Sequence, residues 1–419
     1  MPGERRTLLR LLLAAAGATL VLAAPASGSP SVVYGVQDDA WLRYGPGTLA
    51  QRVDRLENLG VHLVRINVLW SEVEPRRGHF DWSGYDPVLA ALHAAGIEPL
   101  LTLVSTPAWA NGGRGTNWAP TSGATFAAFA AATARRYPYV RRFLIWNEPN
   151  QRRWLRPTSP AVYVTRLLNP AYAAIHRVRE TALVGGGVTA PRAATGGVSP
   201  VAWMKGMAAA HARLDAYAVN PYPLSRLDTP THTSCTHCGY FTMATLPTIR
   251  ADVTRYFGSK PLWLTEYGYQ TSPPDMILGV SQTLQAKYIG EAALKVWKTP
   301  GVTVLIQYLL HDEPNVGGWQ SGLYTAAGKA KLSAHAFPLP LAEVARTGNQ
   351  VSLWGQVRPG SGDRSYILQL RTNGIWRTVA AGKTGTSGAF QRTITAPPRS
   401  AVRVWSPTLG YPSPTLLLS

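Results

Sequence analysis

The segment Phe143-Leu-Ile-Trp-Asn-Glu-Pro-Asn150 consists of four apolar residues followed by a polar turn with Glu148 at its centre. A second segment, Pro261-Leu-Trp-Leu-Thr-Glu-Tyr-Gly-Tyr269, repeats the arrangement, with Glu266 close behind a short apolar run. Such runs, bounded by Pro or Gly, predict short buried strands. Both glutamates are therefore expected where a strand ends, at a mouth of the fold rather than in its core.

Similar apolar runs recur between residues 31 and 344, and segments with helical periodicity separate them. The expected strands are 32–36, 61–68, 97–104, 143–146, 182–186, 217–220, 262–265 and 302–308, and the expected helices are 49–59, 85–95, 124–137, 161–180, 201–214, 249–257, 281–297 and 333–344. Continuous apolar strands are typical of parallel sheets that are covered on both faces. Eight strand–helix units predict a (β/α)8 TIM barrel, with an open doubly wound sheet as the alternative. The run of three glycines at 185–187 is interpreted as a tight turn, because it lacks a phosphate-binding spacing.

The pattern changes at about residue 345. Short alternating runs at 351–356, 365–371, 375–380, 390–395 and 401–405 predict strands, and Asn373-Gly374 is typical of a hairpin turn. The predicted organisation is a catalytic barrel over 27–344 and a small all-β sandwich over 345–419. Trp354, Trp376 and Trp405 could bind carbohydrate there, but core filling of the sandwich is the favoured interpretation.

Residues 1–26 have the features of an export signal. A basic start with Arg5, Arg6 and Arg10 precedes an apolar run rich in Leu and Ala, and Ala24-Pro25-Ala26 fits a small-residue cleavage site. A membrane anchor is the less favoured alternative, because the run is short for a span. We therefore expect a secreted or extracytoplasmic protein, exported by the Sec or twin-arginine route, with no membrane span in the mature chain.

The composition is basic, with 41 Lys and Arg against 22 Asp and Glu and a net charge of +19. Such a charge attracts polyanions. The basic residues are scattered rather than clustered, which favours a solvated surface over nucleic-acid binding and leaves an anionic or cell-envelope glycan as a candidate partner. A monomer is expected.

The chain has two cysteines, Cys235 and Cys238, three positions apart in a polar segment. In an exported protein such a pair predicts a local disulfide. A zinc site formed with His232 and His237 is the alternative. Neither interpretation makes this pair the catalyst.

The segments around the two glutamates resemble clan A glycoside hydrolases, the 4/7 superfamily. Trp146-Asn-Glu-Pro-Asn150 and Leu264-Thr-Glu-Tyr-Gly268 match the motifs of that clan, and Val64-Arg-Ile-Asn-Val-Leu-Trp70 looks like the strand 2 region of its families 5 and 39. The resemblance covers the barrel. It implies a retaining mechanism without cofactor or metal, in which Glu148 is the acid/base and Glu266 is the nucleophile, with carboxyl groups about 5–5.5 Å apart.

Further residues take expected roles from this resemblance. Arg65 is expected to hold Glu266 ionised or to brace the barrel. The Tyr222 hydroxyl would bond Glu266, and Asn147 would contact the sugar 2-hydroxyl. Asn220 stands where the family often has His, so the hydrogen bonding there is expected to differ.

Aromatic residues at strand ends offer flat surfaces for sugar rings, or pack in the core and rim. The candidates are Trp70, Trp109, Trp146, Tyr267, Tyr308 and Trp319. Asp312 and Glu313, after the eighth expected strand, and Asp38 and Asp39, after the first, either bind sugar hydroxyls or are solvated loop charges.

The function expected from all of this is an exported retaining glycosidase that acts on an oligosaccharide or polysaccharide. A non-catalytic glycan-binding protein on the same barrel and a zinc-dependent hydrolase are the alternatives. The sugar, the linkage and the choice between endo and exo action depend on loops whose shape the sequence does not give.

Overall fold

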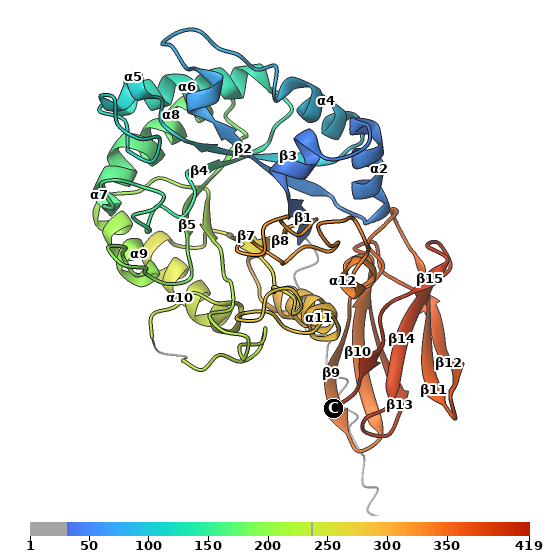
Figure 1. Ribbon diagram of the computed structural model, residues 1–419. Helices are drawn as coiled ribbons and strands as arrows, with labels where there is room; N and C mark the ends of the chain where they lie inside the picture. The colour runs from blue at the N-terminus through green and yellow to red at the C-terminus, as the bar shows by residue number, and fades with distance from the viewer. Residues whose placement is uncertain (1–31, 236–237) are drawn as a thin grey trace, which may run out of the picture.

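A computed structural model describes residues 32–235 and 238–419. The expected export signal lies outside this part of the chain. Eight parallel strands close into a barrel in sequential order, which confirms the predicted TIM barrel and excludes the open sheet. Figure 1 looks into the barrel and shows the helices around it. The strands are β1 (Val33–Gln37), β2 (Leu63–Leu69), β3 (Glu98–Val104), β4 (Arg142–Ile145), β5 (Leu183–Thr189), β6 (Ala216–Val219), β7 (Leu262–Tyr267) and β8 (Val302–Tyr308).

The helices lie close to their predicted positions, and half of the α-helices in the described residues begin at a capping side chain. Thr48 and Gln51 form a reciprocal capping box at the start of α2. Ser122 caps α6, which buries Phe126 and Phe129 against the barrel as its periodicity predicts. The helices of the barrel are α1 (Asp39–Tyr44), α2 (Leu49–Asn58), α3 (Trp70–Val73), α4 (Asp86–Ala94), α5 (Ala108–Asn111), α6 (Gly123–Arg136), α7 (Pro160–Tyr163), α8 (Asn169–Val178), α9 (Pro200–Ala209), α10 (Leu246–Phe257), α11 (Gln282–Lys298) and α12 (Leu332–Ala336). No helix in the described ranges is long and apolar enough to cross a membrane.

Two predicted helices differ from the structure, and proline is the reason in both. The helix expected over 161–180 is divided into α7 and α8 by a π-helical turn, Val164–Leu168, which is followed by Asn169 and Pro170. Proline has no N–H for the helical ladder, so the turn ahead of it widens. The helix expected over 333–344 is wrong in its second half. There α12 ends before Pro338, and Leu341–Thr347 forms strand β9.

The glycine run at 185–187 is part of strand β5 and is not a turn. A side chain at Gly185 would come within 2.7 Å of Leu144 and 2.8 Å of Trp263. A side chain at Gly187 would come within 2.6 Å of the Tyr217 ring. These glycines therefore leave room for large side chains from neighbouring strands.

The C-terminal region forms two antiparallel sheets, which confirms the predicted sandwich. One sheet has the order β13-β10-β9 and the other contains β12, β11, β14, β15 and β16. The hairpin at Asn373-Gly374 has positive φ angles of 50° and 81° at its two central residues, as its sequence predicts. The remaining strands are β10 (Gln350–Gln356), β11 (Ser365–Thr372), β12 (Ile375–Lys383), β13 (Ala389–Thr395), β14 (Ala401–Ser406), β15 (Tyr411–Pro412) and β16 (Leu416–Leu417).

Helix α11 of the barrel packs against the sandwich. The three-stranded sheet lies beside it, and β11 and β12 lie farthest from the barrel (Figure 1). Gly290 of α11 sits so close to β9 that a side chain there would overlap the Leu341 carbonyl. Trp354 of β10 is buried against Trp297 of α11, with ring centroids 5.9 Å apart. Trp354 therefore fills the junction between the two parts rather than the sandwich core.

Candidate active site

The two glutamates lie at the same end of the barrel, because parallel strands bring their C-terminal ends together. Glu148 follows β4, and Glu266 is the penultimate residue of β7. The backbone at Trp146 and Glu148 has positive φ angles of 70° and 41°, so the chain turns sharply as it leaves β4. The two carboxyl groups are near enough for the charge of Glu266 to raise the pKa of Glu148.

Arg65 of β2 connects the surroundings of both glutamates. Its side chain is fully buried, and Nη1 donates to Glu266 Oε1 at 2.7 Å while Nη2 donates to Asn147 Oδ1 at 2.8 Å. Nε donates to Thr102 at 2.8 Å, and Nη1 also reaches the Thr265 carbonyl at 3.1 Å. One guanidinium thus holds Glu266 and the residue next to Glu148 in fixed positions. Both expected roles of Arg65, charge partner and brace, are compatible with this geometry.

The second oxygen of Glu266 accepts a hydrogen bond from the Tyr222 hydroxyl at 3.0 Å. Burial raises the pKa of Glu266, while the charge of Arg65 and the Tyr222 hydrogen bond oppose that rise. Both groups stabilise the carboxylate form. Glu266 is therefore the better prepared of the two glutamates to carry a negative charge.

Glu148 has weaker partners. Asn220 donates from Nδ2 to its Oε1 at 3.1 Å, and the nearby Trp154 side chain slightly lowers its pKa. Burial, followed by the charge of Glu266, raises the pKa of Glu148 to about 7, against the opposing effect of the Asn220 bond. The pair therefore holds a proton on Glu148 near neutral pH, the division that an acid and a nucleophile require. Sequence reasoning noted Asn220 as a departure from the family but did not find Trp154.

Three aromatic rings form a wall beside Glu266. Tyr222 lies 4.8 Å from Trp319 and 6.2 Å from Tyr308, and Tyr308 and Trp319 are 5.6 Å apart between ring centroids. Tyr308 and Trp319 are only partly buried, so they retain surface for a ligand. The structure thus brings together three of the aromatic residues that the sequence singled out.

Trp70 does not belong to this wall, and the prediction that it binds substrate is wrong. Its side chain is 0% exposed and stacks on Phe129 beneath α6. As the first residue of α3, Trp70 turns into the core instead of facing the mouth. Trp109 packs edge-on against Trp70 and donates to the Glu74 carbonyl at 2.8 Å, and it keeps part of its surface exposed.

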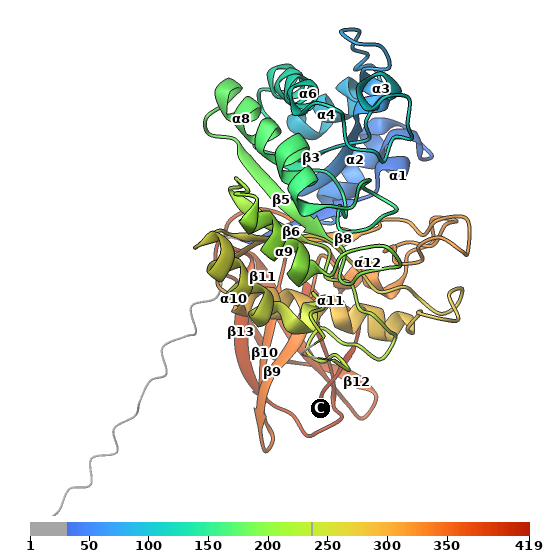
Figure 2. The ribbon, with the colours of Figure 1, turned by 90° about the vertical axis from the view of Figure 1, so that its left-hand side faces the viewer.

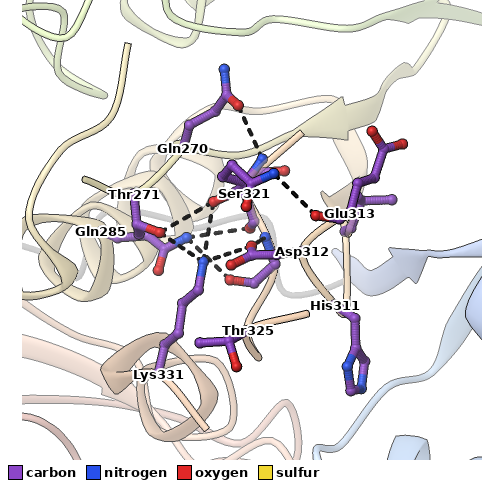
Figure 3. A network of polar contacts seen from close by, with 12 residues as sticks. Gln270, Thr271, Gln285, His311, Asp312, Glu313, Ser321, Thr325 and Lys331 are labelled. Atoms are coloured by element: carbon purple, nitrogen blue, oxygen red, sulfur yellow. Dashed lines mark hydrogen bonds and ion pairs between the residues drawn. The ribbon is translucent and has the colours of Figure 1, made fainter. Parts of the chain in front are cut away.

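Asp312 is not available to bind sugar hydroxyls, because it forms a buried ion pair. Lys331 Nζ donates to Asp312 Oδ1 at 2.6 Å, to Thr271 Oγ1 at 2.8 Å and to the Gln320 carbonyl at 3.1 Å (Figure 3). Glu313 accepts a bond from the Trp319 backbone N–H at 2.9 Å. The two carboxylates after β8 therefore fasten the loop that carries Trp319.

A cavity of about 470 Å³ lies beside Tyr308, at the ends of β1, β2 and β8. Gln37, Asp39, Asn67 and Glu313 are among the residues that line it. The Oε1 atom of Gln37 and the Oδ1 atom of Asn67 are buried there without a hydrogen-bond partner. Gln37 and Asn67 were missed from the sequence, although polar residues inside otherwise apolar strands are a detectable signal. Neither Glu148 nor Glu266 lines this cavity or a larger one of about 630 Å³ between α11 and β9.

Cys235 and Cys238 form the local disulfide that the sequence favoured. Because both sulfurs are consumed in this bond, they provide no thiolate for the alternative zinc site. Within residues 32–235 and 238–419, no group of three or more His, Cys, Asp and Glu side chains is arranged to hold a metal ion.

Comparison with known proteins supports the resemblance to clan A. A family model described as beta-galactosidase, glycoside hydrolase family 42, matches residues 39–112, which contain Arg65 but neither glutamate. A search of curated proteins found no match.

Solved structures match much more of the chain. A family 39 glycoside hydrolase from Bacteroides cellulosilyticus WH2 matches with a TM-score of 0.62 and 16% identity, over 88% of this chain and 81% of its own. A monomeric beta-xylosidase from Caulobacter crescentus CB15 matches with a TM-score of 0.59 and 18% identity, over 89% and 95%. At these identities the matches establish a shared fold, barrel and sandwich together.

Proposed function

We propose that the protein is a retaining glycoside hydrolase that cleaves O-glycosidic bonds in an oligosaccharide or polysaccharide. The observation that carries the proposal is the double contact of Arg65, which bonds Glu266 and Asn147, the residue directly before Glu148, at one end of the barrel. The fold shared with family 39 glycoside hydrolases agrees with it.

The reaction takes place in two displacements. Glu266 attacks the anomeric carbon while Glu148 gives its proton to the departing glycosidic oxygen, so that a glycosyl ester forms on Glu266. Glu148, now a carboxylate, takes a proton from water as that water attacks the same carbon. The ester bond to Glu266 breaks, and both side chains return to their starting states.

The neighbouring residues position the sugar. Because Asn147 accepts from Arg65 through Oδ1, its Nδ2 is left to donate to the sugar 2-hydroxyl. Tyr308 and Trp319 offer ring surface for stacking. The cavity lined by Gln37, Asp39 and Asn67 would hold part of the bound sugar, because Tyr308, which also lines it, is near enough for the charge of Glu266 to raise its pKa.

We also propose that the chain acts outside the cytoplasm. The basic and apolar pattern of residues 1–26 supports export, and a disulfide between Cys235 and Cys238 is compatible with an oxidising compartment.

A panel of aryl glycosides and natural glycans tests the proposal. The wild type should hydrolyse at least one of them, and proton NMR of the first product should show the anomeric configuration of the substrate. Glu266→Gln should lose turnover on every substrate. Glu148→Ala should keep activity on aryl glycosides with good leaving groups, because these need little protonation. A wild type without turnover, and a Glu266→Gln variant that binds glycans equally well, would show a binding protein instead.

A further inference from the structure

Two tryptophans of the sandwich lie outside its core. The core-facing residues of β11 and β14 include Leu368, Val402 and Val404, all buried. Trp405 pairs with Ile367, and Trp376 pairs with Arg371, at the alternate positions of the same strands. Because side chains alternate between the two faces of a sheet, both tryptophans stand on the opposite face. The favoured interpretation, that they fill the core, is therefore wrong.

This outer face is turned away from the barrel, as the positions of β11, β12 and β14 in Figure 1 show. Figure 2 gives a second view, in which the sandwich lies below the barrel. Trp376 and Trp405 are each partly exposed, and neither belongs to a hydrophobic core cluster of the described chain. Two large aromatic rings thus meet solvent on strands that flank β11 on either side.

Arg403 holds the arrangement in place. Its guanidinium carbon lies 4.2 Å from the centre of the Trp376 ring, and its Nε donates to Gln369 Oε1 at 2.8 Å. The cation–π contact covers part of one ring and leaves further guanidinium N–H groups for a ligand. The guanidinium is therefore already held over the Trp376 indole before a ligand binds, which reduces the entropy cost of binding.

The charge of the face points to the ligand. Strands β11, β12 and β14 carry Arg371, Arg377, Lys383 and Arg403 and contain no Asp or Glu. Arg371 and Arg403 stand on the same face as the tryptophans, since both pair with outward-facing positions. A partner that complements them must carry negative charge and flat apolar faces.

We propose that this face, defined by Arg371, Trp376, Arg403 and Trp405, is a second glycan-binding site that takes an acidic polysaccharide. Sugar rings stack on the two indoles, and uronate or sulfate groups pair with the two arginines. The choice of a glycan among polyanions rests on the proposed function. The site lies on the sandwich, whereas Glu148 and Glu266 belong to the barrel, so its binding can be measured independently of catalysis.

Binding of the full-length protein is measured by titration calorimetry at low and high salt. The probes are polygalacturonate for carboxylates, dextran sulfate for sulfates, and neutral dextran for comparison. We expect the two acidic polymers to bind and neutral dextran to bind at least roughly tenfold more weakly. The double variant Trp376→Ala/Trp405→Ala and the single variant Arg403→Ala should each weaken acidic polymer binding by roughly tenfold or more.

Arg392→Ala is the matched control, because Arg392 is exposed on β13 of the other sheet. It should bind as the wild type does, and hydrolysis of an aryl glycoside should be the same in all variants. Circular dichroism checks that each variant is folded. Equal polymer binding by the wild type and the folded double variant would overturn the proposal. So would duplex DNA that displaces the acidic polymers at equal charge concentration, or a wild-type dimer that the double variant abolishes, since either would identify a different partner.

Discussion

The side-chain amide of Asn220 donates a hydrogen bond from Nδ2 to Glu148 at 3.1 Å, and its Oδ1 atom accepts one from the Thr265 hydroxyl at 2.8 Å. One amide side chain thus connects Glu148 to the residue that precedes Glu266. Clan A enzymes often have His here. A neutral amide cannot gain a proton in the working pH range, so the titration of Glu148 is not mixed with that of a neighbouring imidazole.

The Asn220 bond opposes the rise in the pKa of Glu148, so removing it should raise that pKa further. In the wild type, activity should fall as the pH rises through about 7, because the acid then loses its proton. For Asn220→Ala we expect the alkaline limb of the kcat/KM profile to move to higher pH by about one unit. An alkaline limb that stays in place would show that the amide does not act on Glu148.

Loss of Arg65 should act on the acidic limb instead. Arg65 opposes the pKa rise of Glu266, so Arg65→Met should raise that pKa, and activity should begin only at higher pH. The kcat should fall by about a hundredfold or more, because Glu266 and Asn147 also lose their orientation.

Arg142→Met is the matched control for this experiment. Arg142 forms an ion pair with Glu98 at the start of β4, at the opposite end of the barrel. Its removal should leave the pH profile unchanged. An equal displacement of the acidic limb in both variants would mean that Arg65 acts only through general stability.

The chain's local patterns were sufficient to predict where Glu148, Glu266 and Tyr222 lie, because the end of a barrel strand fixes the direction of the next residues. The same patterns did not predict the direction of the Trp70 side chain. The short helix α3 after β2 turns this ring into the core and away from the open end of the barrel. Strand β9 was missed for a related reason. Its residues are compatible with a helix, and only contact with α11 and β10 makes them a strand.

The buried ion pair of Lys331 and Asp312 gives a stability test. Lys331→Met leaves the Asp312 carboxylate buried without its partner, which should cost about 3–5 kcal/mol of unfolding free energy. The double variant Lys331→Met/Asp312→Leu should recover part of this loss, because it removes the unpaired charge. Urea unfolding of the three proteins measures the difference. If the double variant is no more stable than Lys331→Met, the loss does not come from an unpaired Asp312 charge.

Gly290 tests the junction between the barrel and the sandwich. An Ala in the middle of a helix normally stabilises a protein by up to about 1 kcal/mol relative to Gly. At Gly290 the added methyl group would meet the Leu341 carbonyl, so Gly290→Ala should instead lower the unfolding free energy by about 1–3 kcal/mol. The sign of the change in melting temperature decides the matter, and a rise would contradict the close approach of α11 and β9.

Only residues 337–340 separate α12 from β9, and Trp354 inserts beside Trp297 directly behind them. So short a tether gives the sandwich no freedom to swing, and in solution the molecule should tumble as a single rigid particle. A polysaccharide bound to the outer sheet would therefore approach Glu148 and Glu266 in a single orientation. The number of sugar units between the bound segment and the hydrolysed bond would then be set by the fold itself.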